Sequence, residues 1–135
     1  MTSSLQEQLE LDAVTAMHRA YAPYSKFRVG AALRGADGSV HLGCNVENAS
    51  YPAGICAERT ALSRAVADGV REFASIVICT EAEVPTPPCG ICRQVLSEFA
   101  PLLQVTSVTV AGARQTWRLD ALLPAAFAAN LMAVS

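Results

Sequence analysis

The chain has 135 residues, 52% hydrophobic and 16% charged, which fits one compact domain spanning residues 1–135 with a core of its own. Ten Lys and Arg residues against twelve Asp and Glu residues give a formal net charge of −2, and the basic residues form no cluster. Proteins that bind nucleic-acid polymers usually carry a basic surface, so we expect a small substrate and no polynucleotide partner.

The first half of the chain predicts a helix followed by a β-hairpin. Apolar residues recur at helical spacing from Leu5 to Tyr21, and Pro23 disfavours continuation of the helix. Residues 27–33 and 40–46 have the composition of strands. The sequence Gly35-Ala36-Asp37-Gly38 between them is typical of a tight turn.

The second half alternates helices with strands. Residues 56–68 are rich in helix formers and end at Gly69, and residues 73–79 form an apolar run typical of a buried strand. The other predicted elements are a helix over 89–99, strands over 105–111 and 116–119, and a short helix or turn over 122–127. Strand–helix–strand units favour parallel pairing. The sequence therefore predicts an α/β protein: a three-layer α/β/α sandwich around a mixed, mostly parallel five-stranded sheet.

Two cysteine segments carry the chemistry. Cys56-Ala57-Glu58 opens one predicted helix, and Pro88-Cys89-Gly90-Ile91-Cys92 opens another. Helix N-termini favour thiolate over thiol, and Cys89 and Cys92 share one face of a helical turn. Structural zinc sites close with four protein ligands, whereas catalytic sites keep three and leave one position open. Cys56, Cys89 and Cys92 therefore predict a catalytic Zn²⁺ site, one ion per chain, with Glu58 as the proton carrier.

Other interpretations of these segments exist. A lone Cys-x-x-Cys also suits a redox pair or half of a zinc ribbon, but the chain has no second such motif, and a redox pair leaves Cys56 and Glu58 without a role. His18 and His41 are available as fourth ligands, although we expect surface or packing roles for both. Arg59 follows Glu58 and can offset the charge of three thiolates through contacts to sulfur; the alternative is an exposed helix arginine.

The remaining signals concern the compartment. Five cysteines are an odd count, and we expect Cys44 and Cys79 to be buried in strands. The N-terminus has neither the basic start nor the apolar run of a secretion signal. The most apolar region, residues 119–134, is interrupted by Asp120, Pro124 and Asn130, so we expect no membrane span. Together these features predict a cytoplasmic protein.

Four segments make the chain resemble a known family. They are residues 24–32 (YSKFRVGAA), 45–51 (NVENASY), 56–61 (CAERTA) and 88–96 (PCGICRQVL). They are similar to segments of the small, homotetrameric, zinc-dependent cytidine deaminases, and the resemblance covers nearly the whole chain. Nucleobase deaminases combine a zinc ion held by cysteine or histidine with a glutamate that is not a ligand. Pro87 and Ile91 stand where smaller residues are common in the family.

The resemblance implies a reaction: hydrolysis of cytidine and 2′-deoxycytidine to uridine and 2′-deoxyuridine with release of ammonia. In that family a zinc hydroxide attacks C4 of the base, and the residue matching Glu58 carries a proton to N3 and then to the leaving amine. Asn45 and Glu47 are expected to hold the sugar hydroxyls. Phe27 is expected to pack on the base, and the backbone of Ala57 to help seat it.

The resemblance also implies a homotetramer with active sites shared between subunits. Phe127 matches an aromatic residue that reaches into a neighbouring subunit's site. The segment formed by Val46, Asn48, Ala49, Ser50 and Tyr51 is expected to line the pocket or the subunit contact.

Three other functions remain open. A nucleoside-antibiotic deaminase acting on blasticidin S shares the zinc and glutamate segments, although the intact Asn45-Val46-Glu47-Asn48 favours an ordinary ribose. A polynucleotide-editing deaminase needs a basic surface, and a non-catalytic zinc domain needs a fourth protein ligand.

Overall fold

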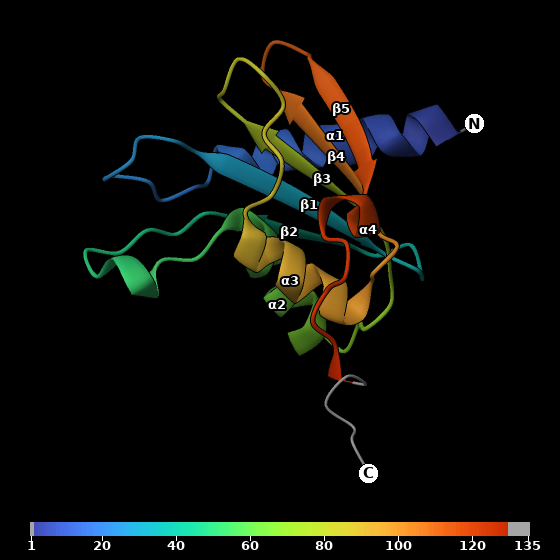
Figure 1. Ribbon diagram of the computed structural model, residues 1–135. Coiled ribbons are helices and arrows are strands. Elements are labelled where there is room, and N and C mark those ends of the chain that lie inside the picture. Colours follow the sequence, from blue (N-terminus) through green and yellow to red (C-terminus); the bar gives the residue numbers. More distant parts are fainter. Residues whose placement is uncertain (1, 130–135) are drawn as a thin grey trace.

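A computed structural model describes residues 2–129 of the chain (Figure 1). The long helix α1 (Thr2–Met17) precedes a hairpin, and the rest alternates helices and strands. The other helices are η1 (a 3-10 helix, Tyr51–Ala53), α2 (Ala57–Ala67), α3 (Gly90–Phe99) and α4 (Leu119–Leu122). The strands are β1 (Val29–Gly35), β2 (Val40–Cys44), β3 (Phe73–Thr80), β4 (Gln104–Thr109) and β5 (Arg114–Arg118).

The sheet is mixed and five-stranded, with the order β2-β1-β3-β4-β5. The predicted sandwich and strand number are confirmed, but the expectation of a mostly parallel sheet is wrong. Only the β3–β4 pair is parallel, while β1–β2, β1–β3 and β4–β5 are antiparallel. The reason is that β1 lies between β2 and β3. The two strands joined through α2 run in the same direction, but each pairs with β1 and not with the other.

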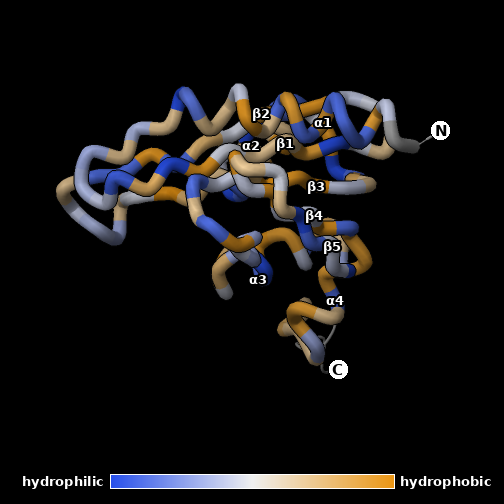
Figure 2. Tube along the Cα trace, turned by 90° about the horizontal axis from the view of Figure 1, so that it is seen from above, coloured by the Kyte–Doolittle hydropathy of each residue, from blue (hydrophilic) through white to orange (hydrophobic). Residues whose placement is uncertain are grey.

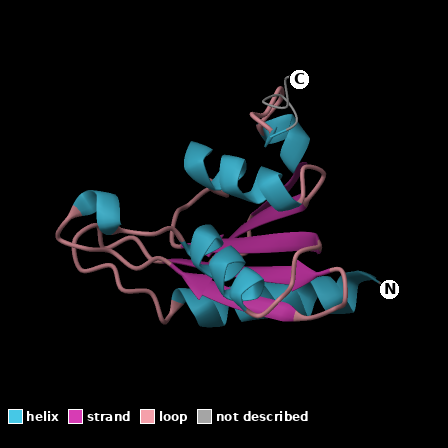
Figure 3. Ribbon diagram, turned by 90° about the horizontal axis from the view of Figure 1, so that it is seen from below, coloured by secondary structure: helices cyan, strands magenta, loops and turns pink. Residues whose placement is uncertain are grey.

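Helices cover both faces of the sheet, as Figure 3 shows. On one face α1 packs against Ala32, Val77 and Val108 through Leu9, Ala13 and Met17. On the other face α2 and α3 pack against the opposite side chains of the same strands, among them Leu33, Ile76, Ile78 and Val105. Because neighbouring residues of a strand point to opposite faces, β3 is buried on both faces and is mostly apolar, whereas β4 also buries Thr106 and Ser107. The orange stretches of the central strands in Figure 2 reflect this.

Two glycines allow helices to lie directly on the sheet. A Cβ atom added at Gly30 would lie 2.1 Å from the carbonyl oxygen of Ala13 in α1. A Cβ atom at Gly43 would lie 2.3 Å from the amide nitrogen of Ala61 in α2. No side chain fits at either position without displacing a helix backbone. Gly43 therefore sets how closely α2, and with it Cys56 and Glu58, approaches the sheet.

Two loops extend from one end of the sheet, and both lead to the site (Figures 1 and 3). The predicted first helix extends to Tyr21, but α1 ends at Met17 because the backbone of Tyr21 pairs with the second loop instead. The Tyr21 amide donates to the Asn45 carbonyl at 2.9 Å, and the Glu47 amide donates to the Tyr21 carbonyl at 2.9 Å. Val46 pairs in turn with Ile55, which closes the second loop and delivers Cys56 beside Asn45.

The other cysteines, the two histidines and the C-terminal region agree only partly with the expectations from the sequence. Cys79 is buried as expected, but Cys44 is only half-buried. His18 is exposed, whereas His41 is buried and contacts the Ser39 hydroxyl at 2.9 Å, a packing role. The helix or turn expected over 122–127 is a turn, because α4 ends at Leu122 and a turn follows at Pro124 and Ala125. Among residues 2–129, no helix is both long and apolar enough to cross a bilayer, and residues 130–134 of the apolar region lie outside the described part.

Candidate active site

Three cysteine sulfurs meet where α2 and α3 begin. Cys56 and Cys89 are the N-cap residues of these helices, and Cys92 lies in the first turn of α3. The three Sγ atoms all lie within 4.8 Å of one another, and those of Cys56 and Cys89 are 3.8 Å apart. Two sulfurs about 2.3 Å from a tetrahedral zinc ion are separated by about 3.8 Å. The predicted cysteine trio therefore converges with the spacing that a zinc ion requires.

The chemistry of the donor set also fits a cation. A hydrogen bond from Cys92, together with Arg59 and Cys89, lowers the pKa of Cys56 to about 5. The pKa of Cys92 is raised, chiefly by this same hydrogen bond to Cys56 and by burial. Ionising one sulfur thus opposes ionising the next, because like charges within a few ångströms repel. A divalent cation removes that conflict and allows all three to bind as thiolates.

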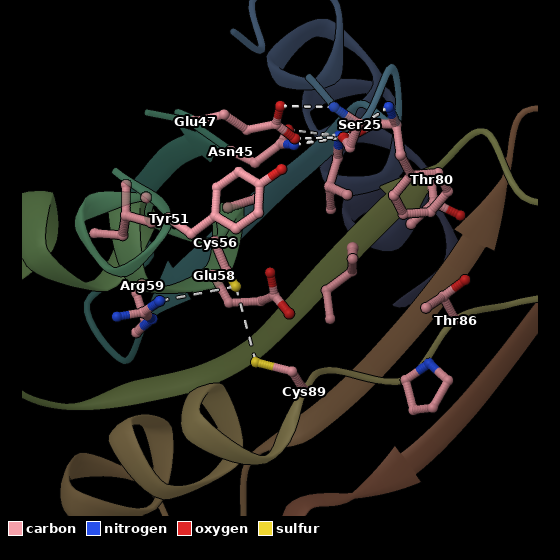
Figure 4. Close-up of a pocket in the computed structure, with 17 residues that line it drawn as sticks. Ser25, Asn45, Glu47, Tyr51, Cys56, Glu58, Arg59, Thr80, Thr86 and Cys89 are labelled. Carbon is pink, nitrogen blue, oxygen red and sulfur yellow. Dashed lines mark hydrogen bonds between the residues drawn. The ribbon is translucent and has the colours of Figure 1, made fainter. Parts of the chain in front are cut away.

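Glu58 lies beside the sulfurs on the first turn of α2, and its side chain is buried. Burial raises its pKa to about 7, with a smaller contribution from the negative charge of Cys56. A carboxyl group with a pKa near neutrality can both accept and donate a proton under physiological conditions. Figure 4 shows the Glu58 carboxyl group in the pocket close to Cys56 and Cys89.

Arg59 contacts the metal-binding residues as the sequence suggests. Its Nη2 atom lies 3.9 Å from the Cys56 sulfur, and the side chain is partly buried. The sulfurs of Cys56 and Cys92 raise the pKa of Arg59 against the opposing effect of burial. The guanidinium group therefore places a positive charge next to thiolates that would leave a zinc site with a net charge of −1. Such a contact adjusts the electron density of the ligand and so the acidity of the metal.

A cavity of about 490 Å³ opens above the cysteines. Its floor is formed by Cys56, Ala57, Glu58 and Cys89, and Phe27, Asn45, Glu47 and Tyr51 belong to its walls. Figure 4 shows Asn45 and Glu47 on one side of the pocket and Thr80 and Thr86 on another. This volume is within the range of pockets for small molecules.

Asn45 and Glu47 are already bonded to the first loop. The Asn45 side chain accepts from the Val29 amide at 2.8 Å and donates to the Phe27 carbonyl at 2.8 Å. The Glu47 carboxylate accepts from the amides of Tyr24 and Ser25 at 3.1 and 3.0 Å. Each side chain retains further hydrogen-bonding capacity, because a carboxylate has about four acceptor positions and an amide four groups.

Five of the predicted substrate-binding residues do not line this cavity. Val46 uses its backbone to pair with Ile55, and the Asn48 side chain accepts from the Ser50 amide at 2.9 Å. Asn48, Ala49 and Ser50 are exposed at the loop tip. Phe127 lies apart from the cavity, 62% exposed, and its carbonyl accepts from Gln94 of α3 at 2.9 Å.

The cavity also contains residues to which the sequence analysis gave no role. Ser25, Val29, Ile55, Ile78, Thr80 and Thr86 belong to its lining. Ser25 and Val29 lie inside the segment 24–32 that carries the family resemblance, so their place in that segment could have indicated a role in the site. Thr80 ends β3, but nothing in the local sequence distinguishes Thr86. Pro87 lines the cavity, whereas Ile91 is 62% exposed.

The segment before Cys89 is held by Arg93, one turn into α3. Its Nε atom donates to the Pro88 carbonyl at 2.7 Å, and its Nη1 atom donates to the Leu122 carbonyl at 2.9 Å. Arg93 thus ties the metal-binding segment to the end of α4. A single guanidinium group suits this role because its donors diverge in a fixed plane.

An α/β/α sandwich with three converging thiols and a buried carboxyl group beside a cavity is the arrangement of a zinc-binding enzyme. Comparison with known proteins agrees: residues 3–108 match the family model described as cytidine and deoxycytidylate deaminase zinc-binding region. The cytidine deaminase of Sporosarcina psychrophila is 44% identical over 90% of both chains. That of Halalkalibacterium halodurans is 45% identical over 93% of this chain and 96% of its own.

Solved structures support the same assignment. A cytidine deaminase from Burkholderia pseudomallei superposes with a TM-score of 0.87 at 49% identity, covering 90% of this chain and 98% of the other. A cytidine deaminase from Mycobacterium tuberculosis gives a TM-score of 0.79 at 36% identity, covering 90% and 96%. The chain belongs to the cytidine deaminase family. It is an enzyme with a zinc-binding deaminase region, and the Cys56, Cys89 and Cys92 trio is the group that can hold the metal.

Proposed function

We propose that this enzyme hydrolyses cytidine and 2′-deoxycytidine to uridine and 2′-deoxyuridine, releasing ammonia. The observation that carries the proposal is the convergence of three sulfurs within 4.8 Å beside a buried carboxyl group in a cavity of small-molecule size. Zn²⁺ bound by Cys56, Cys89 and Cys92 supplies a Lewis acid that makes water nucleophilic near neutral pH.

Glu58 moves the protons of the reaction. Its carboxylate accepts a proton from the attacking water as oxygen adds to C4, and delivers that proton to N3 of the pyrimidine. The hydroxyl group now on C4 gives a second proton through Glu58 to the exocyclic amine. The C4–N bond breaks, ammonia leaves, and the C4 hydroxyl oxygen becomes the carbonyl oxygen of uridine. The pKa near 7 suits both directions of transfer. Proton transfer by a positioned group contributes about 10²–10⁴-fold to the rate.

The other pocket residues bind and orient the nucleoside. Phe27 packs on the base, the Ala57 backbone helps seat it, and Asn45 and Glu47 hold the sugar hydroxyls. The presence of all four in one cavity supports these roles. Arg59 offsets the thiolate charge. Val46, Asn48, Ala49, Ser50 and Tyr51 belong to the pocket rim or to a subunit contact.

We extend the proposal to assembly and location. The whole chain acts as one deaminase domain, and four copies form a homotetramer in which Phe127 completes a neighbouring site. The exposure of Phe127 and its distance from its own cavity support this. We also propose a cytoplasmic location, which cysteines without disulfide bonds support, since reduced thiols persist in a reducing compartment.

An absorbance assay with cytidine tests the function. The zinc-loaded protein should convert cytidine to uridine with one equivalent of ammonia, lose the activity with a chelator and regain it on addition of Zn²⁺. Blasticidin S serves as the competing substrate. Zinc-loaded protein that leaves cytidine intact, or that turns over only blasticidin S, would refute the proposal.

A further inference from the structure

The loop that carries Phe27 has a hydroxyl group at its centre, that of Ser25. The Ser25 Oγ atom donates to Oε2 of Glu47 and accepts a hydrogen bond from the Phe27 amide at 3.0 Å. Because a lone pair of the Ser25 oxygen accepts the hydrogen bond from the Phe27 amide, the hydroxyl proton of Ser25 points at the Glu47 carboxylate. Ser25 thus connects Glu47, on the second loop, to the backbone of Phe27, on the first.

The backbone between Ser25 and Phe27 is in a disfavoured conformation. Lys26 has φ of 61°, in the left-handed region that residues with a Cβ atom seldom adopt. Such conformations persist where surrounding contacts determine them, and they cluster at functional sites. The surrounding contacts here are the bonds of Ser25 and Asn45: the Phe27 amide bonds to Ser25, and the Phe27 carbonyl to Asn45 at 2.8 Å.

Three hydrogen bonds orient the Glu47 carboxylate. Oε1 accepts from the amides of Tyr24 and Ser25, and Oε2 accepts from the Ser25 hydroxyl. The two amides alone hold one oxygen and leave the carboxylate free to rotate about it. The Ser25 hydroxyl fixes the second oxygen. Both Ser25 and Glu47 line the cavity, so the orientation fixed in this way is the one presented to a ligand (Figure 4).

We propose that Ser25 is a positioning residue for sugar recognition, because its hydroxyl orients the Glu47 carboxylate toward the sugar hydroxyls of the substrate. This inference rests on the proposed function, in which Glu47 binds the sugar. It assigns to Ser25 a role that needs a hydroxyl group and not merely a small side chain. Threonine keeps that group, and alanine removes it.

The same contact affects the ionisation of Glu47. Hydrogen bonds from the Ser25 hydroxyl and then from the Ser25 amide are the main causes of a lowered pKa at Glu47, and burial opposes them. The Tyr24 amide and the Lys26 charge lower this pKa further by smaller amounts. The phenols of Tyr24 and Tyr51 also lie near it in an adjoining hollow. A lowered pKa keeps the carboxylate ionised, and so able to accept hydrogen bonds from the sugar, until the pH falls below that pKa. Without the hydroxyl, this binding fails at a higher pH.

The test compares Ser25→Ala, Ser25→Thr and Ser63→Ala with the wild type, using zinc-loaded protein. Ser63 is an exposed serine of α2 and serves as the matched control. The substrates are cytidine and 2′,3′-dideoxycytidine, which lacks the 2′ and 3′ hydroxyls and keeps the 5′ hydroxyl. Ser25→Ala should raise KM for cytidine about tenfold, the effect of losing one charge-assisted hydrogen bond. Its kcat should change by less than about twofold, because the sugar is bound equally in the ground state and the transition state.

Three further results are expected. Ser25→Thr should have a cytidine KM close to that of the wild type. Ser25→Ala should leave KM for 2′,3′-dideoxycytidine nearly unchanged. As the pH is lowered, the cytidine KM of Ser25→Ala should begin to rise at a higher pH than that of the wild type. In the double variant Ser25→Ala/Glu47→Ala the effect of Ser25→Ala should vanish, since the orienting contact then has no acceptor to act on.

Several outcomes would overturn the inference. These are an unchanged cytidine KM in Ser25→Ala, an equal rise for both substrates, or equal defects in the alanine and threonine variants, which would indicate a structural role only. Equal wild-type KM values for the two substrates would overturn the sugar contact of Glu47 and this inference with it. A wild type that does not deaminate cytidine would instead refute the proposed function.

Discussion

Glu58 combines two properties that seldom occur together: it is 5% exposed, and it lies on the first turn of a helix. The helix N-terminus favours its negative form, while burial and the neighbouring Cys56 sulfur favour its neutral form. Burial prevails, and the pKa rises to about 7. An exposed glutamate at the same helix position would have a lower pKa and would be a weaker base toward water at neutral pH.

Glu58→Gln should abolish most of the turnover without releasing the metal. The amide keeps the size of the side chain but cannot carry a proton, so kcat for cytidine should fall by about 10²–10⁴-fold. Zinc content, measured by atomic absorption, should remain near one ion per chain. Glu98→Gln, at an exposed position of α3, is the control. Substantial activity in Glu58→Gln would remove Glu58 from the mechanism.

At the scale of elements, the position of α2 on the sheet depends on Gly43 of β2. The helix backbone lies so close that a Cβ atom would be 2.3 Å from the Ala61 nitrogen and 2.5 Å from the Ala57 carbonyl oxygen. Cys56 and Glu58 precede and follow Ala57, so any displacement of α2 is passed to one ligand and to the proton carrier.

Gly43→Ala should therefore reduce both stability and zinc binding. Overpacking typically costs about 1–3 kcal/mol, and the displaced groups here are backbone. Urea unfolding and zinc titration measure the two effects. Gly38→Ala is the comparison: its Cβ meets no atom within 4 Å, and only its φ of 88° adds strain, of about 1–2 kcal/mol. Zinc affinity should fall in Gly43→Ala alone. Equal zinc affinity in the two variants would contradict the argument.

The sequence predicts elements better than their arrangement. Local patterns place the helices at Cys56 and Cys89 within one residue of their observed starts, and they identify the β1–β2 hairpin. They do not show that β1 is inserted between β2 and β3, because strand order depends on contacts between distant segments. The early end of α1 at Met17 has the same cause, since Tyr21 pairs with Asn45 and Glu47.

The site shows a similar division. Metal ligands and Glu58 have a spacing that the chemistry requires, so the cysteine trio is identifiable from the sequence. The hydroxyl of Ser25 and the side chain of Thr86 reach the cavity only because loops fold back over it. Loop conformation depends on individual hydrogen bonds, such as those of Asn45 and Glu47, which leave no periodic pattern in the sequence.

For the molecule as a whole, the cysteine trio is a link between α2 and α3. Removing zinc should therefore lower the melting temperature as well as activity, because binding to the folded state alone stabilises it. We expect a decrease of at least about 5 °C in a thermal scan after chelation, and a similar decrease in Cys89→Ala. Cys44→Ala, outside the trio, should respond to chelation as the wild type does. A melting temperature unaffected by chelation would count against ligation.

A shared active site can be tested by mixing two defective variants. Phe127→Ala should raise KM for cytidine with zinc content unchanged, and Glu58→Gln should be inactive. If Phe127 completes a neighbouring site, hybrids refolded from both variants contain sites with Glu58 from one chain and Phe127 from the next. Such hybrids should recover the wild-type KM. In the control, Leu102→Ala is mixed with Glu58→Gln in place of Phe127→Ala, because Leu102 is also an exposed apolar residue, 63% exposed. Failure of hybrids to recover would place Phe127 outside the neighbouring subunit's site.

The bond from Arg93 to the Leu122 carbonyl makes the end of α4 part of the scaffold for Cys89. A protein fused after α4, or a chemical attachment to a solid support there, would transmit force to the Arg93 guanidinium group, which also donates to the Pro88 carbonyl. The opposite terminus leads into α1, which packs on the other face of the sheet. An immobilised or tagged form of this enzyme should accordingly be anchored ahead of α1, where mechanical load does not reach the metal.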